Sequence, residues 1–250
     1  ESVNTMLTPW GEALTGTPLP EYPRPQLKRE SYLNLNGLWN YTVQDGEEYT
    51  KNKTGTIVVP FSPESLLSGC DFQLQSGETL WYERTFTLPE EAAGQRVKLN
   101  FGAVDFKCEA WVNGKSVGVH EGGYASFSFE ITDALVPGEN TIVVCADDDQ
   151  LSGKQPYGKQ SFRYESFGCF YTRTTGIWQT VWLEFTPKTY IDSVRITPDD
   201  RNHCVAFAAK VDGCAKDTVI KAQISRDGRI VGGACARPVP GVTNFMADVS

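Results

Sequence analysis

The chain has 250 residues, of which 40% are hydrophobic and 12% aromatic, enough apolar material for one large or two ordinary domains. Its formal charge is −8, from 23 Lys and Arg against 31 Asp and Glu. Because an acidic surface repels phosphate backbones and no basic block reverses the charge locally, we do not expect nucleic acid as a partner.

The first 36 residues are rich in proline and predict an extended, irregular arm. The first strand patterns cover residues 37–43, 56–59 and 80–88. Residues 96–101 then alternate strictly between polar and apolar side chains, which is the period of a half-buried strand. The single helical candidate is 62–68, where Ser62 suits an N-cap and Pro63 the first helical position. It predicts one or two turns.

The centre of the chain predicts a hairpin. Residues 106–112 alternate between polar and apolar side chains, and Asn113-Gly114 follows at once. This pair indicates a hairpin turn, because both turn positions need a positive φ. Residues 115–119 are then expected to form the return strand. Further strands are expected at 127–131, 141–146 and 178–185. Eight or nine strands favour a two-sheet jelly-roll sandwich. The connections 60–79 and 147–177 are long enough to be candidates for function.

A second unit is expected to start near Pro187. Short strand patterns lie at 190–196, 205–211, 219–224 and 230–231, with an Asp227-Gly228 turn. An immunoglobulin-like sandwich needs about seven strands, so this one is expected to be incomplete. We therefore predict an all-β chain, with a jelly-roll β-sandwich over 1–187 and a truncated immunoglobulin-like β-sandwich over 188–250.

Seven cysteines are present, an odd number without a CxxC pair, which argues against a disulfide framework and favours a reducing cytoplasm. The first residues have neither the basic start nor the apolar region of a leader, so the protein is expected to be cytoplasmic or already trimmed. No stretch reaches the roughly 18 apolar residues of a membrane helix.

Candidate catalytic groups are sparse. His120 and His203 are the only histidines, and neither pattern indicates a catalytic triad or a His-ligated metal. The run 147–149, three aspartates, suits either a calcium site or strand-end acids that cap turns, and we favour the second. No spacing marks the paired carboxylates of glycoside hydrolysis. We expect no metal and no cofactor.

The segment 162–185 is the most informative part of the sequence. It places many aromatic side chains beside arginines and hydroxyl groups, a mixture that suits stacking on sugar rings and hydrogen bonding to sugar hydroxyls. Ordinary packing of a long loop as it re-enters a sheet explains the same composition. The residues alone leave the two interpretations equal.

The segment 171–184, with Arg173, Gly176-Ile177-Trp178 and Trp182, resembles the end of the sugar-binding domain in family 2 glycoside hydrolases, the relatives of β-galactosidase, β-glucuronidase and β-mannosidase. Motifs in the same order and spacing extend the resemblance over about residues 30–250. They are Leu35-Asn36-Gly37-Leu38-Trp39, Val59-Pro60-Phe61-Ser62-Pro63-Glu64-Ser65, Trp81-Tyr82-Glu83-Arg84, Phe101-Gly102-Ala103-Val104-Asp105, Val112-Asn113-Gly114, His120-Glu121-Gly122-Gly123-Tyr124 and Gly138-Glu139-Asn140.

The resemblance implies a jelly roll, an immunoglobulin-like domain and then a catalytic (β/α)8 barrel that this chain lacks. It therefore implies a non-catalytic portion of an exo-β-glycosidase, with a β-glycoside as the partner of the whole enzyme. An open alternative is a stand-alone carbohydrate-binding β-sandwich module. A purely structural module for subunit contacts is a third reading, and a homo-oligomer is also open.

In relatives, an aspartate three residues before the position of Arg173 contacts the sugar, but Phe170 stands there in this chain. The resemblance implies substrate contacts for Arg173, Tyr171 and Glu64. The alternative for Arg173 is structural, a salt bridge to Asp105 that holds the loop to the sheet, and this is the reading that we favour.

Overall fold

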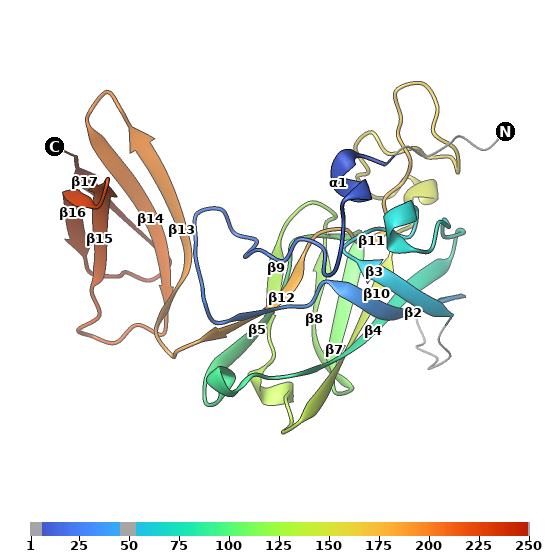
Figure 1. Cartoon of the computed structure of the whole chain (residues 1–250), viewed down its shortest axis with the longest axis horizontal. Helices are drawn as coiled ribbons and strands as arrows, with labels where there is room; N and C mark the ends of the chain where they lie inside the picture. Colours follow the sequence, from blue (N-terminus) through green and yellow to red (C-terminus); the bar gives the residue numbers. More distant parts are fainter. Residues whose placement is uncertain (1–6, 46–53, 250) are drawn as a thin grey trace. The chain divides into compact units, whose positions relative to one another are not determined.

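The computed structural model describes residues 7–45 and 54–249, and these residues form two compact units. Unit 1 comprises the chain up to Pro23 together with Ser31–Phe185, and unit 2 comprises Arg24–Glu30 together with Thr186–Ser250. Strands dominate both units (Figure 1). The predicted all-β sandwich class is confirmed.

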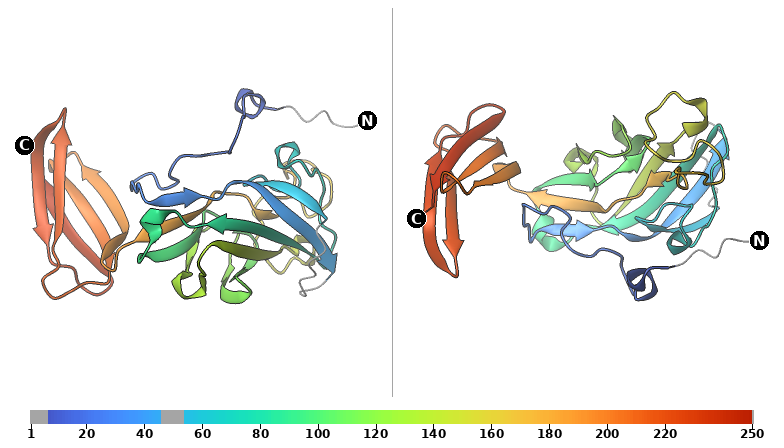
Figure 2. Two further views of the ribbon diagram at one scale, coloured as in Figure 1. Left: turned by 60° about the horizontal axis from the view of Figure 1, so that its bottom comes forward. Right: turned by 90° about the horizontal axis from the view of Figure 1, so that it is seen from above.

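Unit 1 is built on two antiparallel sheets, whose strands are seen from two further sides in Figure 2. The six-stranded sheet consists, in spatial order, of β3 (Gly55–Val59), β2 (Gly37–Asp45), β4 (Glu78–Thr87), β10 (Glu139–Asp147), β7 (Lys107–Val112) and β8 (Lys115–Glu121). The four-stranded sheet consists of β1 (Tyr32–Asn34), β12 (Val181–Thr186), β5 (Arg96–Phe101) and β9 (Phe127–Glu130). A small ladder joins β6 (Val104–Asp105) to β11 (Gly176–Ile177).

The predicted central hairpin is confirmed. Along β7 half-buried and buried positions alternate as the sequence pattern requires, with Cys108, Ala110 and Val112 facing the core. Asn113 and Gly114 have φ values of 51° and 78°, the left-handed conformation that these residue types tolerate best. The Asn113 side chain also donates to the Ala134 carbonyl, so it ties the turn to a neighbouring segment.

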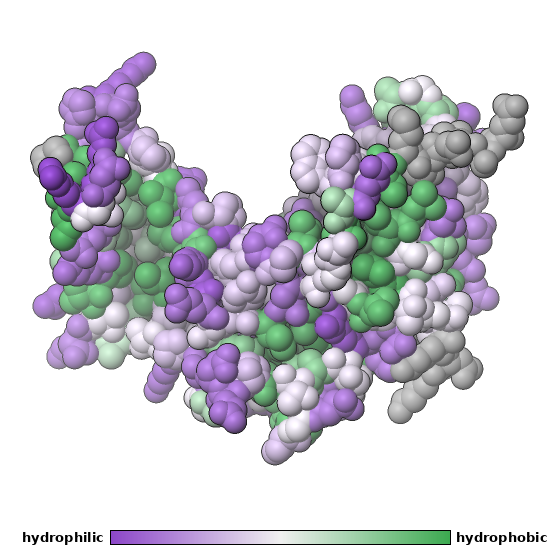
Figure 3. Space-filling view, viewed as in Figure 1, coloured by the Kyte–Doolittle hydropathy of each residue, from purple (hydrophilic) through white to green (hydrophobic). Residues whose placement is uncertain are grey.

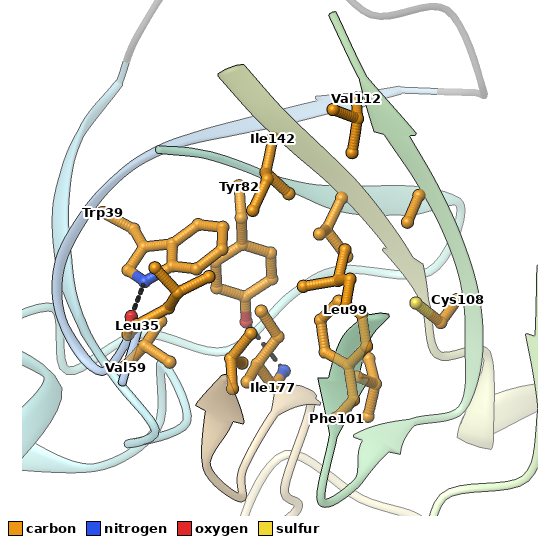
Figure 4. Close-up of a cluster of buried hydrophobic side chains, with 14 of the residues drawn as sticks. Leu35, Trp39, Val59, Tyr82, Leu99, Phe101, Cys108, Val112, Ile142 and Ile177 are labelled. Carbon is orange, nitrogen blue, oxygen red and sulfur yellow. Dashed lines mark hydrogen bonds between the residues drawn. The ribbon is translucent and has the colours of Figure 1, made fainter. Parts of the chain in front are cut away.

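The core lies between the two sheets and takes side chains from both (Figure 4). Trp39 and Tyr82 come from the six-stranded sheet, whereas Leu99 and Phe101 come from the four-stranded one, and none is more than 1% exposed. The Trp39 indole donates to the Leu35 carbonyl at 2.7 Å, so its polar group is satisfied inside the core. Burying each such side chain contributes roughly 1.5–3 kcal/mol.

Helices are few and short among the described residues, and they differ from the prediction. The 62–68 segment forms only a 3-10 turn, η1 (Leu66–Ser68), and its N-cap is Ser65, whose hydroxyl accepts from Leu67 N, rather than Ser62. The arm, predicted as extended throughout, contains the one-turn helix α1 (Pro9–Glu12), capped by Thr8. Single turns have no room for the 3.6-residue periodicity on which a prediction rests. The other 3-10 turns are η2 (Glu90–Ala92), η3 (Thr132–Ala134) and η4 (Gln150–Ser152).

Unit 2 has five strands in its described part. One sheet contains β13 (Tyr190–Asp199), β14 (Cys204–Asp212) and β17 (Val242–Asp248), and the other contains β15 (Ile220–Arg226) and β16 (Arg229–Ala236). The predicted Asp227-Gly228 turn joins β15 to β16, with φ values of 50° and 77°. Residues 24–30 of the arm belong to this unit, where Arg24 donates to the Asp192 carbonyl and Gln26 pairs with the backbone of Ile196.

Unit 2 buries its apolar side chains less completely than unit 1. The largest fully buried side chains of the described residues all lie in unit 1, whereas Phe207 and Phe245 of unit 2 stack on each other and stay half-buried. Apolar atoms remain visible on this unit in Figure 3. Among the described residues, no helix is both long and apolar enough to span a membrane.

Candidate functional site

The two long loops of unit 1, 60–79 and 147–177, are joined to each other by hydrogen bonds. Gln73 Nε2 donates to the Tyr164 carbonyl at 2.6 Å, and Arg173 donates from its guanidinium to the Leu74 carbonyl at 2.8 Å. Thr175 N donates to Glu64 Oε2 at 3.2 Å. We call the surface formed by these two loops the loop end of unit 1.

A network of buried polar side chains lies under the loop end. Gln160 Nε2 donates to Asp105 Oδ2 at 2.8 Å and contacts the Tyr124 hydroxyl at 3.1 Å, while Gln160 Oε1 accepts from Thr174 N. Thr175 Oγ1 donates to Asp148 Oδ2 at 2.8 Å. The network therefore connects β6 to the 147–177 loop and joins the two ends of that loop through Thr175 and Asp148, which fixes its path.

Burial changes the acidity of two carboxyl groups in this region. It raises the pKa of Asp105 to about 7, and the nearby charges of Asp148 and Glu64 act in the same direction, against the hydrogen bond from Gln160. Burial also raises the pKa of Glu64, whereas hydrogen bonds from Thr175 and Ser62 lower it. Asp105 consequently gains a proton more readily in the folded protein than in the unfolded chain.

The expected salt bridge between Arg173 and Asp105 is absent from the described residues. Arg173 is 3% exposed, and its guanidinium lies 5.3 Å from the centre of the Tyr164 ring, beside the Leu74 carbonyl. Asp105 faces elsewhere, because Oδ2 bonds to Gln160 and Oδ1 lies against Gly123, where a Cβ atom would be only 2.1 Å away. Arg173 does hold the loop in place, but through a backbone carbonyl and an aromatic ring.

Exposed aromatic side chains cover the loop end. Tyr171, one of the residues singled out in the sequence, is 51% exposed, and its backbone pairs with Lys159 and Ser161. Exposures of 54%, 41% and 39% are found for Tyr124, Phe162 and Tyr164. Exposed rings next to hydrogen-bonding groups are suited to stacking on an amphipathic ligand.

Phe170, which stands where the resemblance placed an aspartate, belongs to an aromatic cluster. Its ring stacks on Phe167 at 5.1 Å and meets the edge of Phe162 at 5.7 Å. Arg163 lies over Phe167, 4.2 Å from the ring centre. The tip of the 147–177 loop is therefore held by its own side chains, and Phe170 brings no carboxylate to it.

Within the acidic run 147–149, the Asp148 carboxylate is used for hydrogen bonding. Asp148 accepts from Thr175 and from Gln155, in agreement with the strand-end interpretation. No group of three or more His, Cys, Asp or Glu side chains in the described ranges is arranged to hold a metal ion. His120 lies on β8 with its ring 3.9 Å from Phe127, and His203 occupies a turn with a φ of 49°.

Comparison with known proteins identifies the domain. Residues 69–187 match the family described as glycosyl hydrolases family 2, sugar binding domain. The chain carries a sugar-binding domain of glycoside hydrolase family 2. The family 2 domain thus covers both joined loops from Gly69 onward, including Arg173 and Tyr171.

Curated relatives of this family 2 chain include a β-galactosidase of Thermoanaerobacter pseudethanolicus, 29% identical over 70% of this chain and 23% of the relative. A β-glucuronidase of Paenibacillus borealis is 25% identical over 71% of this chain and 33% of its own length. The chain therefore spans about a quarter to a third of the length of these relatives.

Solved structures share the fold. A β-glucuronidase of Bifidobacterium dentium, in complex with coumarin-3-O-glucuronide, aligns with a TM-score of 0.66 at 21% identity, over 89% of this chain and 43% of that one. A β-glucuronidase of Ruminococcus gnavus, in complex with C6-substituted uronic isofagomine, aligns with a TM-score of 0.65 at 18% identity, over 92% of this chain and 41% of that one.

Proposed function

We propose that this chain is the non-catalytic N-terminal portion of a family 2 exo-β-glycosidase, and that its loop end contacts the β-glycoside bound by the whole enzyme. The observation that supports this most strongly is the combination of exposed aromatic rings with a buried network that fixes their backbone. Tyr171 and Tyr164 offer ring surfaces, while the Gln160–Asp105 contact lies beneath them. Sites of this kind bind by pre-organised stacking and hydrogen bonding.

The predicted substrate-binding residues take different roles in this proposal. Tyr171 contacts the sugar directly, since half of its side chain is exposed. Arg173 acts as a positioning residue, because its guanidinium is buried against Leu74 and Tyr164. Glu64 retains one buried carboxylate oxygen without a hydrogen-bond partner, which leaves it available to a ligand hydroxyl.

Kinetics of the longer enzyme that contains this chain test the proposal. Tyr171→Ala should raise KM for an aryl β-glycoside several-fold with an unchanged melting temperature, as expected for a lost substrate contact. Val136→Ala is a matched control, since Val136 is 47% exposed in the turn before β10, outside both loops. Equal kinetics for the two variants would contradict a role of the loop end in substrate binding.

A stand-alone carbohydrate-binding module is the second candidate function, and the open aromatic surface of the loop end favours it. The mass of the native gene product, measured by immunoblot in the source cells, separates the two candidates. A band far above 27.7 kDa supports the glycosidase, and a band at 27.7 kDa supports the module.

We also propose a reducing compartment, such as the cytoplasm, for the protein. Seven free cysteines support this assignment, three of them exposed: Cys169, Cys214 and Cys235.

We further propose that the longer enzyme assembles into a homo-oligomer. Sedimentation of that enzyme under reducing conditions would test the assembly.

A further inference from the structure

A pocket of about 330 Å³ opens at the loop end of unit 1, within the size range of small-molecule sites. One wall comes from the 60–79 loop and another from Tyr164 of the 147–177 loop. The lining residues are Glu64, Asp71, Phe72, Gln73, Gln75 and Tyr164. The hydrogen bond from Gln73 to the Tyr164 carbonyl holds the two walls together.

Two acceptors in this lining lack a donor. Glu64 Oε1 and Gln73 Oε1 are buried oxygens without a hydrogen-bond partner, although the other side-chain atoms of both residues are bonded to Thr175 and Tyr164. Buried acceptors are nearly always satisfied in folded proteins. A hydroxyl group in the pocket would supply the missing donors.

The charge of the lining is negative. Glu64 and Asp71 contribute two carboxyl groups, and no Lys or Arg is among the six residues. Arg173 contacts the Tyr164 ring, but its guanidinium is buried beside the Leu74 carbonyl and is not part of the lining. An anionic ligand entering the pocket would meet like charges, which costs binding free energy.

Two aromatic rings complete the pocket. Phe72 is fixed by stacking on Tyr41, with 5.5 Å between ring centres, and Tyr164 is fixed by Arg173 and by the bond from Gln73 to its carbonyl. Rings held in this way offer apolar surface at little entropic cost. The combination of apolar walls with acceptors suits a polyol ring that has one apolar face.

We propose that this pocket binds one neutral hexopyranose unit, which donates hydroxyl hydrogen bonds to Glu64 and Gln73, and that it discriminates against the corresponding uronic acid. The inference rests on the proposed function, and it names the substrate class at the loop end. The expected discrimination follows from the lining, which holds two carboxyl groups and neither Lys nor Arg.

The test compares methyl β-D-glucopyranoside with methyl β-D-glucopyranosiduronate, two probes that differ only in the C6 carboxylate. Binding to the 250-residue chain is followed through the side-chain amide signals of Gln73 and Gln75 in two-dimensional NMR. The neutral glycoside should shift the Gln73 signal, and the uronate should bind at least about threefold more weakly. Gln73→Leu should weaken the neutral glycoside by about fivefold, as expected for one lost hydrogen bond.

Two further variants keep the test decisive. Gln95→Leu is the matched control, because Gln95 is a half-buried residue of another turn, outside both loops, whose side-chain amide donates to the Glu91 carbonyl. The affinity of this variant should equal that of the parent chain. Tyr164→Ala removes a pocket side chain that is 39% exposed. It should weaken binding of the neutral glycoside, and it tests the pocket separately if Gln73→Leu impairs folding.

Each remaining outcome overturns a defined part of the inference. Uronate binding as tight as that of the neutral glycoside, with the same Gln73 shift, would refute the sugar class and leave the proposed function standing. Binding that is insensitive to Gln73→Leu and Tyr164→Ala would refute the pocket. Absence of all binding would refute the inference, while the Tyr171 kinetics of the longer enzyme would still decide the proposed function.

Discussion

Gln160 and Asp105, 55 positions apart in the sequence, form a buried side-chain hydrogen bond of 2.8 Å that attaches the 147–177 loop to β6. Asp105 is 1% exposed, so its carboxyl group cannot turn toward water. Keeping the charged carboxylate buried costs free energy, and protonation removes that cost. The order of the loop end thus depends on an ionisable group.

Asp105 should make unit 1 more stable in mild acid than in mild base. Its pKa is about 7 in the folded protein and near 3.8 in the unfolded chain, so folding takes up a proton and the free energy of unfolding falls as the pH rises from about 4 to 7. Asp105→Asn should remove that slope and stabilise unit 1 at pH 8 by roughly 2–4 kcal/mol. Thermal unfolding at pH 5 and pH 8 measures both effects.

The exposed Asp133, in η3, provides the control for this experiment. Asp133→Asn should retain the pH slope of the parent chain. A parent chain whose stability rises steadily toward pH 8 would refute a protonated Asp105 in the folded state.

Gly123→Ala should destabilise unit 1 by more than about 2 kcal/mol, because the new Cβ atom would lie 2.1 Å from Asp105 Oδ1. Chemical denaturation measures this cost. In an Asp105→Ala background the same change should cost much less, since its steric partner is gone. Gly11→Ala, whose Cβ would meet only ordinary contacts near 3.5 Å, serves as control. Additive costs for the pair would show that another contact excludes a side chain at Gly123.

Arg173→Ala should cost about 2–3 kcal/mol and loosen the 147–177 loop, since it removes a charged donor from the Leu74 carbonyl and a packed guanidinium from Tyr164. Hydrogen exchange should increase selectively in residues 160–172. Arg173→Lys should recover only part of the protection, because an ammonium group lacks the planar fork of the guanidinium. Full recovery by lysine would indicate that charge alone positions the loop.

Asn113→Ala should destabilise the central hairpin by about 1–3 kcal/mol. Alanine pays a steric cost at a φ of 51°, and the change removes hydrogen bonds to Ala134 and Asn140. Asn113→Asp keeps the tolerance for this backbone conformation and is the comparison variant, expected to lose less. Equal losses in thermal melting would assign the whole effect to hydrogen bonding.

The sandwich was predictable from local patterns because alternation and turn chemistry act over a few residues. The alternation over residues 106–112 predicts a strand with one buried face, and Asn113-Gly114 predicts the turn that follows. The one-turn elements α1 and η1 were not predicted with their observed bounds, because they are too short to show a helical repeat of apolar residues.

The interior of the loop end could not be derived from such patterns. The sequence marked Arg173, Tyr171 and Glu64 through a family resemblance, and all three lie on the joined loops. The partners of Arg173 depend on how two loops, about 100 residues apart in sequence, meet in space. No sequence pattern pointed to Gln160, because a lone glutamine in a loop has the same local sequence pattern whether its side chain is buried or solvated.

The assignment of residues 24–30 to unit 2 bears on how this protein can be dissected. Unit 2 is discontinuous in sequence, so a cut after Phe185 yields a first fragment that still carries a piece of the second. Arg24 and Gln26 would then lose the backbone acceptors that Asp192 and Ile196 provide. An isolated second fragment starting at Thr186 would lack the same segment, and a clean separation requires replacing the arm as well as choosing the boundary.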